Sequence, residues 1–264
     1  MTPGAGRVPA RLSLPARAWR RLGVVSNQAV MASIGRWLHA SNAPYMLEHR
    51  PDFHRGGGMA DYHALRRGWI HSNEGNNGGD FARLYMLHLN VEAVLASGVA
   101  GDLVELGVYK GNSAYLLARS ARRHGRTTYL FDTFEGFDSR DFQHEDADRP
   151  KAFADTSLGA VRRLVGDEAT VYVQGYFPES ARTIDMPARI AVAHIDCDLY
   201  EPMKAALAEF YPRLSPGGLL VMHDYASGQW PGATRAVDEF FADKPEKPIL
   251  GPDKSGSALI RRAA

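Results

Sequence analysis

Two strand-like segments of this sequence end in groups that can bind a cation or move a proton. Asp196 follows an apolar run in the stretch HIDCDLYEP, and His223 and Asp224 follow the run GLLVM further along the chain. Carboxylates that meet at one edge of a sheet, together with water, suit Mg²⁺, and a carboxylate there can also serve as a general base. Asp196 and Asp224 are therefore candidate metal ligands, Asp196 is also a candidate base, and His223 is a candidate ligand or base.

Simpler interpretations compete for three residues of these segments. Asp198 and Glu201 form the pattern D-x-x-E, which is typical of a capping box, so we interpret Asp198 as the start of a helix over 200–213. Cys197, the single cysteine of the chain, is interpreted as a small apolar filler at the end of a buried strand. A lone histidine on a strand is about as often a satisfied core residue as a ligand, and both interpretations of His223 stay open.

A glycine-containing turn in VELGVYKGNSAYLLA is typical of a nucleotide-binding crevice. Gly107 allows the backbone to turn sharply and to approach a ligand, and Gly111 and the start of the next helix present free N–H groups. The dinucleotide fingerprint G-x-G-x-x-G is absent, and Glu105 stands two residues before the first glycine. A carboxylate there would repel a pyrophosphate, so we expect a cationic ligand; the alternative is a purely structural turn.

The stretch LFDTFEGF places Asp132 at the end of the second strand-like run. An acid at this place in a nucleotide-binding sheet can accept hydrogen bonds from both hydroxyls of a ribose. Taken alone, it fits a loop carboxylate in an Asx-turn equally well. Together with the glycine turn, the ribose interpretation is favoured.

The elements that must position these residues alternate between strands and helices. After a helix over 81–97, the sequence predicts strands at 102–107, 128–132, 170–174, 190–196 and 218–224, and helices near 111–123, 155–165, 178–184, 200–213 and 231–242. Continuously apolar strands that alternate with helices are typical of a parallel sheet covered on both faces. The last short runs, 248–250 and 257–262, would close the sheet without an intervening helix. The predicted fold class is therefore α/β.

The composition excludes several classes of protein. The chain has 264 residues and a formal net charge of +1, which does not suggest nucleic acid or an anionic membrane as a partner. No segment reaches the ~18 apolar residues of a membrane-spanning helix, and a single cysteine excludes an intrachain disulfide. We therefore expect a cytoplasmic protein.

The N-terminal part of the chain is predicted to differ from the rest. Its first residues are rich in Gly, Pro and Arg, and apolar residues then recur at helical spacing from Pro15 to about Ala40. We divide the chain into a disordered tail (1–14), a helical extension (15–97) and a ligand-binding catalytic domain (98–264).

Five motifs together resemble one family of enzymes. The sequence contains, in this order, ELGVYKGNSA, FDTFEGF, HIDCDLYEPMKAAL, YPRLSPGGLLVMHDY and WPGATRAVDEFF. Over about residues 74–262 it is similar to the macrocin O-methyltransferase family of class I S-adenosylmethionine enzymes, whose Rossmann-like sheet is mostly parallel with an antiparallel C-terminal strand. The resemblance implies methyl transfer from S-adenosylmethionine to a hydroxyl of a sugar or glycosylated natural product. The partner would be a small-molecule or glycan acceptor.

The resemblance also implies a set of site residues. The cofactor would be bound by Glu105, Gly107, Tyr109, Gly111, Ser113, Asp132, Thr133, Gly175, Tyr176, Phe177 and Asp196. Asp132 would accept the ribose hydroxyls, Ser113 would face the methionine carboxylate, and residues 175–177 would border the adenine. The metal would be bound by Asp196, His223 and Asp224, and the catalytic residues would be Asp196 and His223.

The metal site departs from the family pattern at one residue. Several family members use Mg²⁺, and metal-dependent members have two adjacent acids where this chain has His223 and Asp224. Histidine suits Mg²⁺ poorly and Mn²⁺ or Zn²⁺ better, so we expect Mg²⁺ with Mn²⁺ as the alternative.

Other functions and arrangements stay open at the level of sequence. A nicotinamide-dependent oxidoreductase on the same sheet is one alternative, although the missing fingerprint counts against it. A non-catalytic scaffold, in which His223 marks a lost metal site, is the other. The N-terminal helices resemble a lid over the cofactor, but they would also fit a subunit contact in a homo-oligomer.

The acceptor pocket is expected to come from the loops that follow the strands. These loops, together with the segment 50–80, contain polar and aromatic residues that fit a sugar as well as a phenol, namely Phe137, Phe142, His144 and Trp230.

Overall fold

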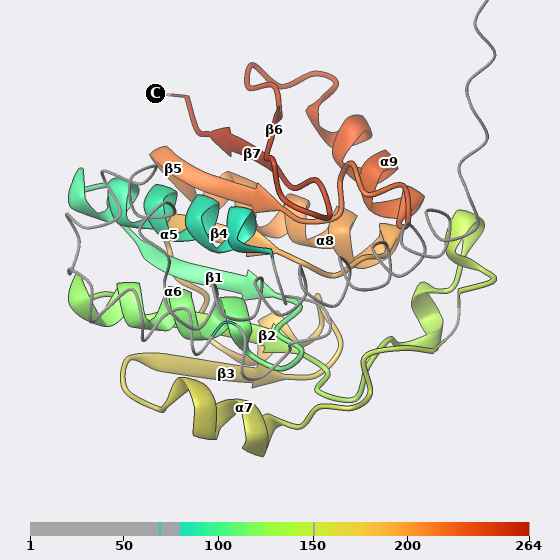
Figure 1. Cartoon of the computed structure of the whole chain (residues 1–264), viewed down its shortest axis with the longest axis horizontal. Helices are drawn as coiled ribbons and strands as arrows, with labels where there is room; N and C mark the ends of the chain where they lie inside the picture. The colour runs from blue at the N-terminus through green and yellow to red at the C-terminus, as the bar shows by residue number, and fades with distance from the viewer. Residues whose placement is uncertain (1–68, 70–79, 150, 264) are drawn as a thin grey trace, which may run out of the picture. The chain divides into compact units, whose positions relative to one another are not determined.

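The computed structural model describes residues 69, 80–149 and 151–263 (Figure 1). The predicted disordered tail, the helices expected near residues 15–40 and nearly all of the loop 50–80 lie outside the described residues. The predicted lid and subunit contact therefore stay predictions.

A seven-stranded sheet forms the centre of the described region, in the order β3-β2-β1-β4-β5-β7-β6 (Figure 1). The strands are β1 (Asp102–Leu106), β2 (Thr128–Asp132), β3 (Thr170–Gln174), β4 (Ile190–Ile195), β5 (Leu214–Met222), β6 (Ile249–Leu250) and β7 (Ala258–Arg261). The first five are parallel, and β7 is antiparallel both to β5 and to β6. The predicted α/β fold with an antiparallel C-terminal strand is confirmed.

Helices cover both faces of this sheet. They are α5 (Phe81–Ala96), α6 (Asn112–Arg123), α7 (Leu158–Val165), α8 (Tyr200–Phe210) and α9 (Pro231–Phe241). Figure 1 shows α5, α6 and α7 on one face and α8 and α9 on the other. Four short 3-10 turns are η1 (Ser139–Asp141), η2 (His144–Asp146), η3 (Ser180–Thr183) and η4 (Tyr211–Arg213).

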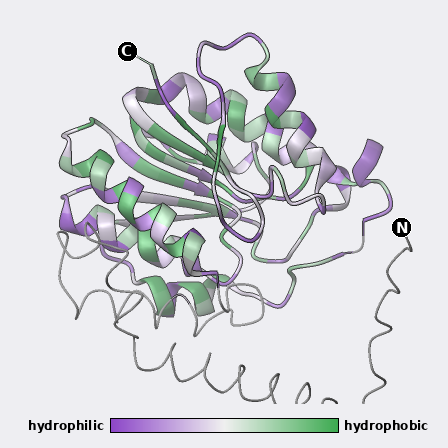
Figure 2. Ribbon diagram, turned by 45° about the horizontal axis from the view of Figure 1, so that its top comes forward, coloured by the Kyte–Doolittle hydropathy of each residue, from purple (hydrophilic) through white to green (hydrophobic). Residues whose placement is uncertain are grey.

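The apolar character of the strands explains this layered arrangement. Every residue of β4 is buried, and Figure 2 shows mostly hydrophobic strands beside helices that alternate between hydrophobic and hydrophilic faces. On the side of α8 and α9, Phe131, Phe177 and Phe210 pack against one another. A parallel strand buried on both faces must be apolar along its length, which is why the sequence revealed these strands.

Three predicted elements differ from the structure in their type or their bounds. The helix expected over 178–184 is a single 3-10 turn, and the helix expected from residue 155 begins only at Leu158, after the Ser157 cap. The strand expected over 218–224 begins at Leu214 and ends at Met222, so His223 lies just beyond its end. Helix α5 lies within the predicted extension 15–97 and packs on the sheet beside α6, and the division into an extension and a catalytic domain stays a prediction.

Among the helices of the described residues, none combines the length and the apolar character needed to cross a membrane.

Candidate active site

A cavity of about 410 Å³ opens at the carboxyl ends of β1, β2, β4 and β5. In an open α/β sheet, ligands bind at this edge, where the connections from neighbouring strands diverge. The cavity is lined by eleven of the residues predicted for the site, namely Gly107, Tyr109, Ser113, Asp132, Thr133, Gly175, Tyr176, Phe177, Asp196, His223 and Asp224. Among the described residues, its wall does not include Glu105 or Gly111.

The turn after β1 brings two strand ends into close contact at the floor of the cavity. Gly107 has φ +87°, and a Cβ atom at this position would lie 1.9 Å from the carbonyl oxygen of Asp196. The Asp196 N–H donates to the carbonyl oxygen of Leu106 over 2.8 Å, which continues the pairing of β1 with β4 past the strand ends. Only glycine combines this backbone conformation with this approach.

Asp132 organises the loops around the cavity. One carboxylate oxygen accepts hydrogen bonds from the N–H groups of Val108 (2.7 Å) and Tyr109 (2.8 Å). The other accepts from the N–H of Phe134 (2.7 Å), which is the Asx-turn considered in the sequence analysis. The structure therefore combines both interpretations, since Asp132 forms the turn and also lines the cavity.

A second wall is built around Tyr176. Its hydroxyl donates to a carboxylate oxygen of Asp141 over 2.7 Å, and the Arg140 guanidinium lies 3.5 Å from the centre of its ring. Arg140 is itself held by two hydrogen bonds to Asp138, of 2.9 and 2.8 Å. Burial raises the pKa of Asp141 to about 6. Sequence reasoning missed Asp141, because nothing in a loop sequence marks which carboxylate becomes buried.

The Asp141→Asn variant should gain stability relative to the wild-type protein as the pH rises through about 6. A pKa raised in the folded state means that folding favours the protonated acid, so stability is lost between about pH 4 and pH 6 as the carboxyl ionises. Asparagine keeps an oxygen that accepts the hydrogen bond from the Tyr176 hydroxyl, and it is uncharged at every pH in this range. Thermal unfolding at about pH 4 and about pH 7.5 should show a difference in Tm between variant and wild type only at the higher pH.

The Asp138→Asn variant provides a control of opposite sign in the same loop. In the wild-type protein, pairing with Arg140 lowers the pKa of Asp138 to about 2, so the Asp138 carboxylate stabilises the fold at neutral pH and loses this contribution on acidification. Asp138→Asn should therefore be less stable than wild type at neutral pH. An Asp141→Asn variant that is equally stable relative to wild type at both pH values would contradict the raised pKa.

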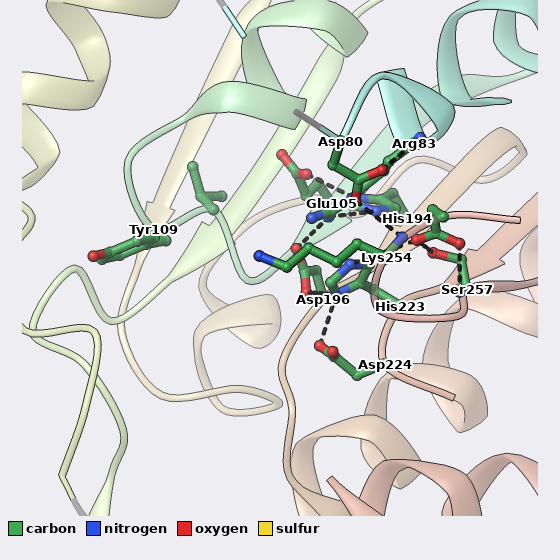
Figure 3. A network of polar contacts seen from close by, with 12 residues as sticks. Asp80, Arg83, Glu105, Tyr109, His194, Asp196, His223, Asp224, Lys254 and Ser257 are labelled. Atoms are coloured by element: carbon green, nitrogen blue, oxygen red, sulfur yellow. Dashed lines mark hydrogen bonds and ion pairs between the residues drawn. The ribbon is translucent and has the colours of Figure 1, made fainter. Parts of the chain in front are cut away.

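At the other end of the cavity, His223 joins two carboxylates (Figure 3). Its Nδ1 atom lies 2.7 Å from Asp196 Oδ1 and 2.7 Å from Asp224 Oδ2. Burial and the charge of Arg83 oppose protonation of His223, but the two carboxylates outweigh them and raise its pKa to about 9. Burial alone would raise the pKa of Asp196, but Arg83 and His223 hold it well below its usual range.

These three side chains also form a suitable set of ligands for a divalent cation. One donor atom from each of Asp196, His223 and Asp224 lies within 4.8 Å of the others. With a pKa of about 9, His223 is protonated at neutral pH, so an ion would have to displace that proton to bind the imidazole. Two carboxylate oxygens and one imidazole nitrogen then fit Mn²⁺ better than Mg²⁺, because Mg²⁺ prefers oxygen ligands alone. The residues present therefore fit a divalent ion.

Asp198 does not form the predicted capping box. The N-cap of α8 is Leu199, whose apolar side chain cannot form a capping hydrogen bond. Instead, the N–H of Tyr200 donates to a carboxylate oxygen of Asp146 over 2.8 Å. Asp198 has φ +61° and lines the cavity. Burial raises the pKa of Asp198 well above its usual range, and Asp224 and Asp196 raise it further. Asp198 thus extends the acid cluster, and its interpretation as a helix cap was wrong.

Glu105 lies behind the cavity. Its side chain is fully buried, and Oε1 is 2.7 Å from Nδ1 of His194, the residue beside it in register on β4. Residues in register on neighbouring parallel strands point to the same face, and here that is the face covered by α5. The structure therefore does not support direct contact between Glu105 and a bound ligand. Gly111 instead faces α7, where a Cβ would lie 3.1 Å from Val161.

The fold and the site define a class of protein. A sheet of this order, with a reversed β7 and a cavity between the glycine turn and an acid cluster, is that of the class I methyltransferases. The family described as Macrocin-O-methyltransferase (TylF) matches residues 78–258, and the chain belongs to this family.

Similar proteins of known activity share part of this sequence. The 8-demethyl-8-(2,3-dimethoxy-alpha-L-rhamnosyl)-tetracenomycin-C 4'-O-methyltransferase of Streptomyces olivaceus is 35% identical over 54% of this chain and 60% of its own. The Mycinamicin III 3''-O-methyltransferase of Micromonospora griseorubida is 31% identical over 60% and 67%. The solved structure of the O-methyltransferase NovP is 28% identical over 69% of this chain and 80% of that one, with a TM-score of 0.61. The matched region thus spans about two thirds or less of the curated relatives.

Proposed function

We propose that this protein is an S-adenosylmethionine-dependent O-methyltransferase that acts on a hydroxyl of a sugar or glycosylated natural product. Membership of the family and the names of the relatives, one of which is a 4'-O-methyltransferase of a rhamnosyl-tetracenomycin and another a 3''-O-methyltransferase of mycinamicin III, support the reaction class. The observation that carries the proposal is a single cavity that joins the Gly107 turn to the cluster of Asp196, His223 and Asp224.

The cofactor would occupy the part of the cavity between β1 and β3. Its methionine end would lie along residues 107–113 at the start of α6, and its adenine would lie beside Tyr176 and Asp141. Asp132 would bind the ribose, although both of its oxygens already accept backbone hydrogen bonds. Oδ2 already accepts from Val108 and Tyr109, which fills its two lone pairs, whereas Oδ1 accepts from Phe134 and has one lone pair left for a ribose hydroxyl.

The acceptor hydroxyl would attack the methyl carbon, the bond from carbon to sulfur would break, and the sulfur would keep the electron pair. A divalent ion held by Asp196, His223 and Asp224 would supply a Lewis acid that lowers the pKa of the hydroxyl. Asp196 lines the cavity and would accept the hydroxyl proton; because Arg83 and His223 lower the pKa of Asp196, this transfer would depend on the lowered pKa of the hydroxyl. The walls around residues 107–113 and 175–177 would hold donor and acceptor in line, which itself lowers the barrier.

Calorimetry with S-adenosylhomocysteine and product analysis with glycosylated acceptors test this proposal together. We expect heat on titration with S-adenosylhomocysteine, no heat with NAD, and a mass gain of one methyl group on an acceptor with a free sugar hydroxyl. Binding of NAD in its place would favour an oxidoreductase. Binding of S-adenosylhomocysteine without methylation of any glycoside in a broad panel would favour the non-catalytic scaffold.

A further inference from the structure

An arginine that the proposed reaction does not use lies against the acid cluster. Arg83, in the first turn of α5, places Nη2 2.5 Å from Asp196 Oδ2 (Figure 3). The Arg83 side chain is only 8% exposed, and its guanidinium lies 5.6 Å from the centre of the Trp69 ring. Both oxygens of Asp196 are therefore engaged, Oδ2 by Arg83 and Oδ1 by His223.

A buried pair of residues supports Arg83 from behind. Nη2 lies 3.4 Å from Nε2 of His194, and Nδ1 of His194 lies 2.7 Å from Glu105. Arginine has only donors, so Nε2 of His194 must accept and Nδ1–H must donate to Glu105. The direction of hydrogen bonding is thus fixed along the row Glu105, His194, Arg83, Asp196, and both Glu105 and His194 are fully buried.

The start of α5 is fixed as well. Asp80 accepts a hydrogen bond from the N–H of Arg83 over 3.1 Å, which caps the helix. The second carboxylate oxygen of Asp80 accepts from the N–H of Lys254 over 3.3 Å, and Lys254 belongs to the loop between β6 and β7. Asp80 therefore holds the backbone of Arg83, while Asp196 and His194 hold its side chain.

Stability alone is a weak explanation for such an arrangement. A buried ion pair loses so much hydration that a well-packed apolar pair of the same size is often equally stable. A row with a fixed direction of hydrogen bonding does, however, fix the rotation of a carboxylate. Mutation of an outer group that orients a metal ligand or a base typically lowers metal affinity or activity by about 10- to 100-fold.

We propose that Arg83 is a positioning residue of methyl transfer, which turns Asp196 so that Oδ1 faces His223 and Asp224, and that the buried Glu105 and His194 fix Arg83 in turn. The proposal rests on the proposed function and deepens it. In this proposal, Glu105 acts on the cavity indirectly, through the side chains of His194 and Arg83.

The test compares Arg83→Met, Arg83→Lys and the control Arg213→Met, a surface arginine that pairs with Glu209 one turn away. We expect kcat of Arg83→Met to fall about 100-fold with the KM for S-adenosylmethionine changed by less than about threefold. Mn²⁺ affinity, measured by electron paramagnetic resonance without any substrate, should fall about tenfold. Arg83→Lys should recover part of both losses, and Arg213→Met should match the wild-type protein.

A second measurement does not depend on activity. Urea unfolding of Arg83→Met, Asp196→Ala and the double variant should give a double variant less destabilised than the sum of the single variants, because each single variant removes the contact between the two side chains. If Arg83→Met does not fold, Arg83→Lys decides the question in the same assays.

Two results would overturn the role of Arg83: wild-type kcat and Mn²⁺ affinity in a folded Arg83→Met, or strictly additive unfolding energies. An unchanged Arg83→Met in an otherwise active enzyme would leave the proposed function standing. A wild-type protein that binds no S-adenosylhomocysteine would instead overturn the proposed function, and the role of Arg83 in methyl transfer with it.

Discussion

Replacing Asp196 by asparagine should lower kcat by about 1,000-fold and abolish Mn²⁺ binding, while the affinity for S-adenosylhomocysteine changes by less than about threefold. The variant removes the charge that would attract both a divalent ion and the hydroxyl proton. Asparagine keeps an oxygen that can accept from Arg83, so the contact with α5 is retained and the fold should persist. Single-turnover kinetics, paramagnetic resonance and calorimetry measure the three quantities separately.

The Asp167→Asn variant is a matched control, since Asp167 pairs with Arg162 on the surface and takes no part in the cavity wall that the described residues form. It should behave as wild type in all three assays. Chelation of the wild-type protein adds a further comparison: activity should fall, and Mn²⁺ should restore it better than Mg²⁺, because one ligand is an imidazole. Full activity of Asp196→Asn would show that Asp196 has no role in the mechanism, and full activity after chelation would show that the reaction needs no metal ion.

The sequence was sufficient for the parts of the site that follow from strand ends. Asp196 and Asp224 lie together because β4 and β5 are parallel neighbours, and the carboxyl ends of such strands meet at one edge. Asp132 lines the same cavity for the same reason, since β2 pairs with β1. Each of these strands is a continuous apolar run, so its end could be located without knowledge of the tertiary structure.

The parts that the sequence did not reveal depend on distant contacts. Arg83 precedes His194 and Asp196 by more than a hundred residues, and its role appears only when α5 packs on the face to which Glu105 and His194 point. The alternation of side chains along a strand determines the side of the sheet to which Glu105 points. That His194 is the partner of Glu105, however, follows only from the register of β1 with β4.

Asp198 shows how a correct local pattern can give a wrong interpretation. The pattern D-x-x-E occurs at this helix start, but Asp198 adopts a left-handed backbone conformation and lies one residue before the N-cap. The N–H of Tyr200 is bonded instead to Asp146, which comes from the loop after β2. The start of α8 is therefore capped by Asp146 from a distant segment of the chain, and Asp198 lines the cavity instead.

The Gly107→Ala substitution should have the largest effect on stability of any single change in the cavity floor. The left-handed φ of +87° costs an alanine about 1–2 kcal/mol, and its Cβ would lie 1.9 Å from the carbonyl oxygen of Asp196. The Cβ is bonded directly to the backbone just after β1, and the oxygen belongs to the backbone just after β4, so neither can move without separating the strands. We expect a loss on the order of 4 kcal/mol in the free energy of unfolding and no detectable binding of S-adenosylhomocysteine.

Gly125→Ala separates the two causes of this loss. Gly125 also has a positive φ, of +63°, but a Cβ there would meet no atom of the described residues within 4 Å. Its cost in urea unfolding should therefore be the conformational part alone, about 1 kcal/mol, with cofactor binding unchanged. Equal losses in the two variants would mean that the ends of β1 and β4 are further apart than the structure shows. The close contact that places Asp196 beside the glycine turn would then be absent, and with it the geometric basis for a single site.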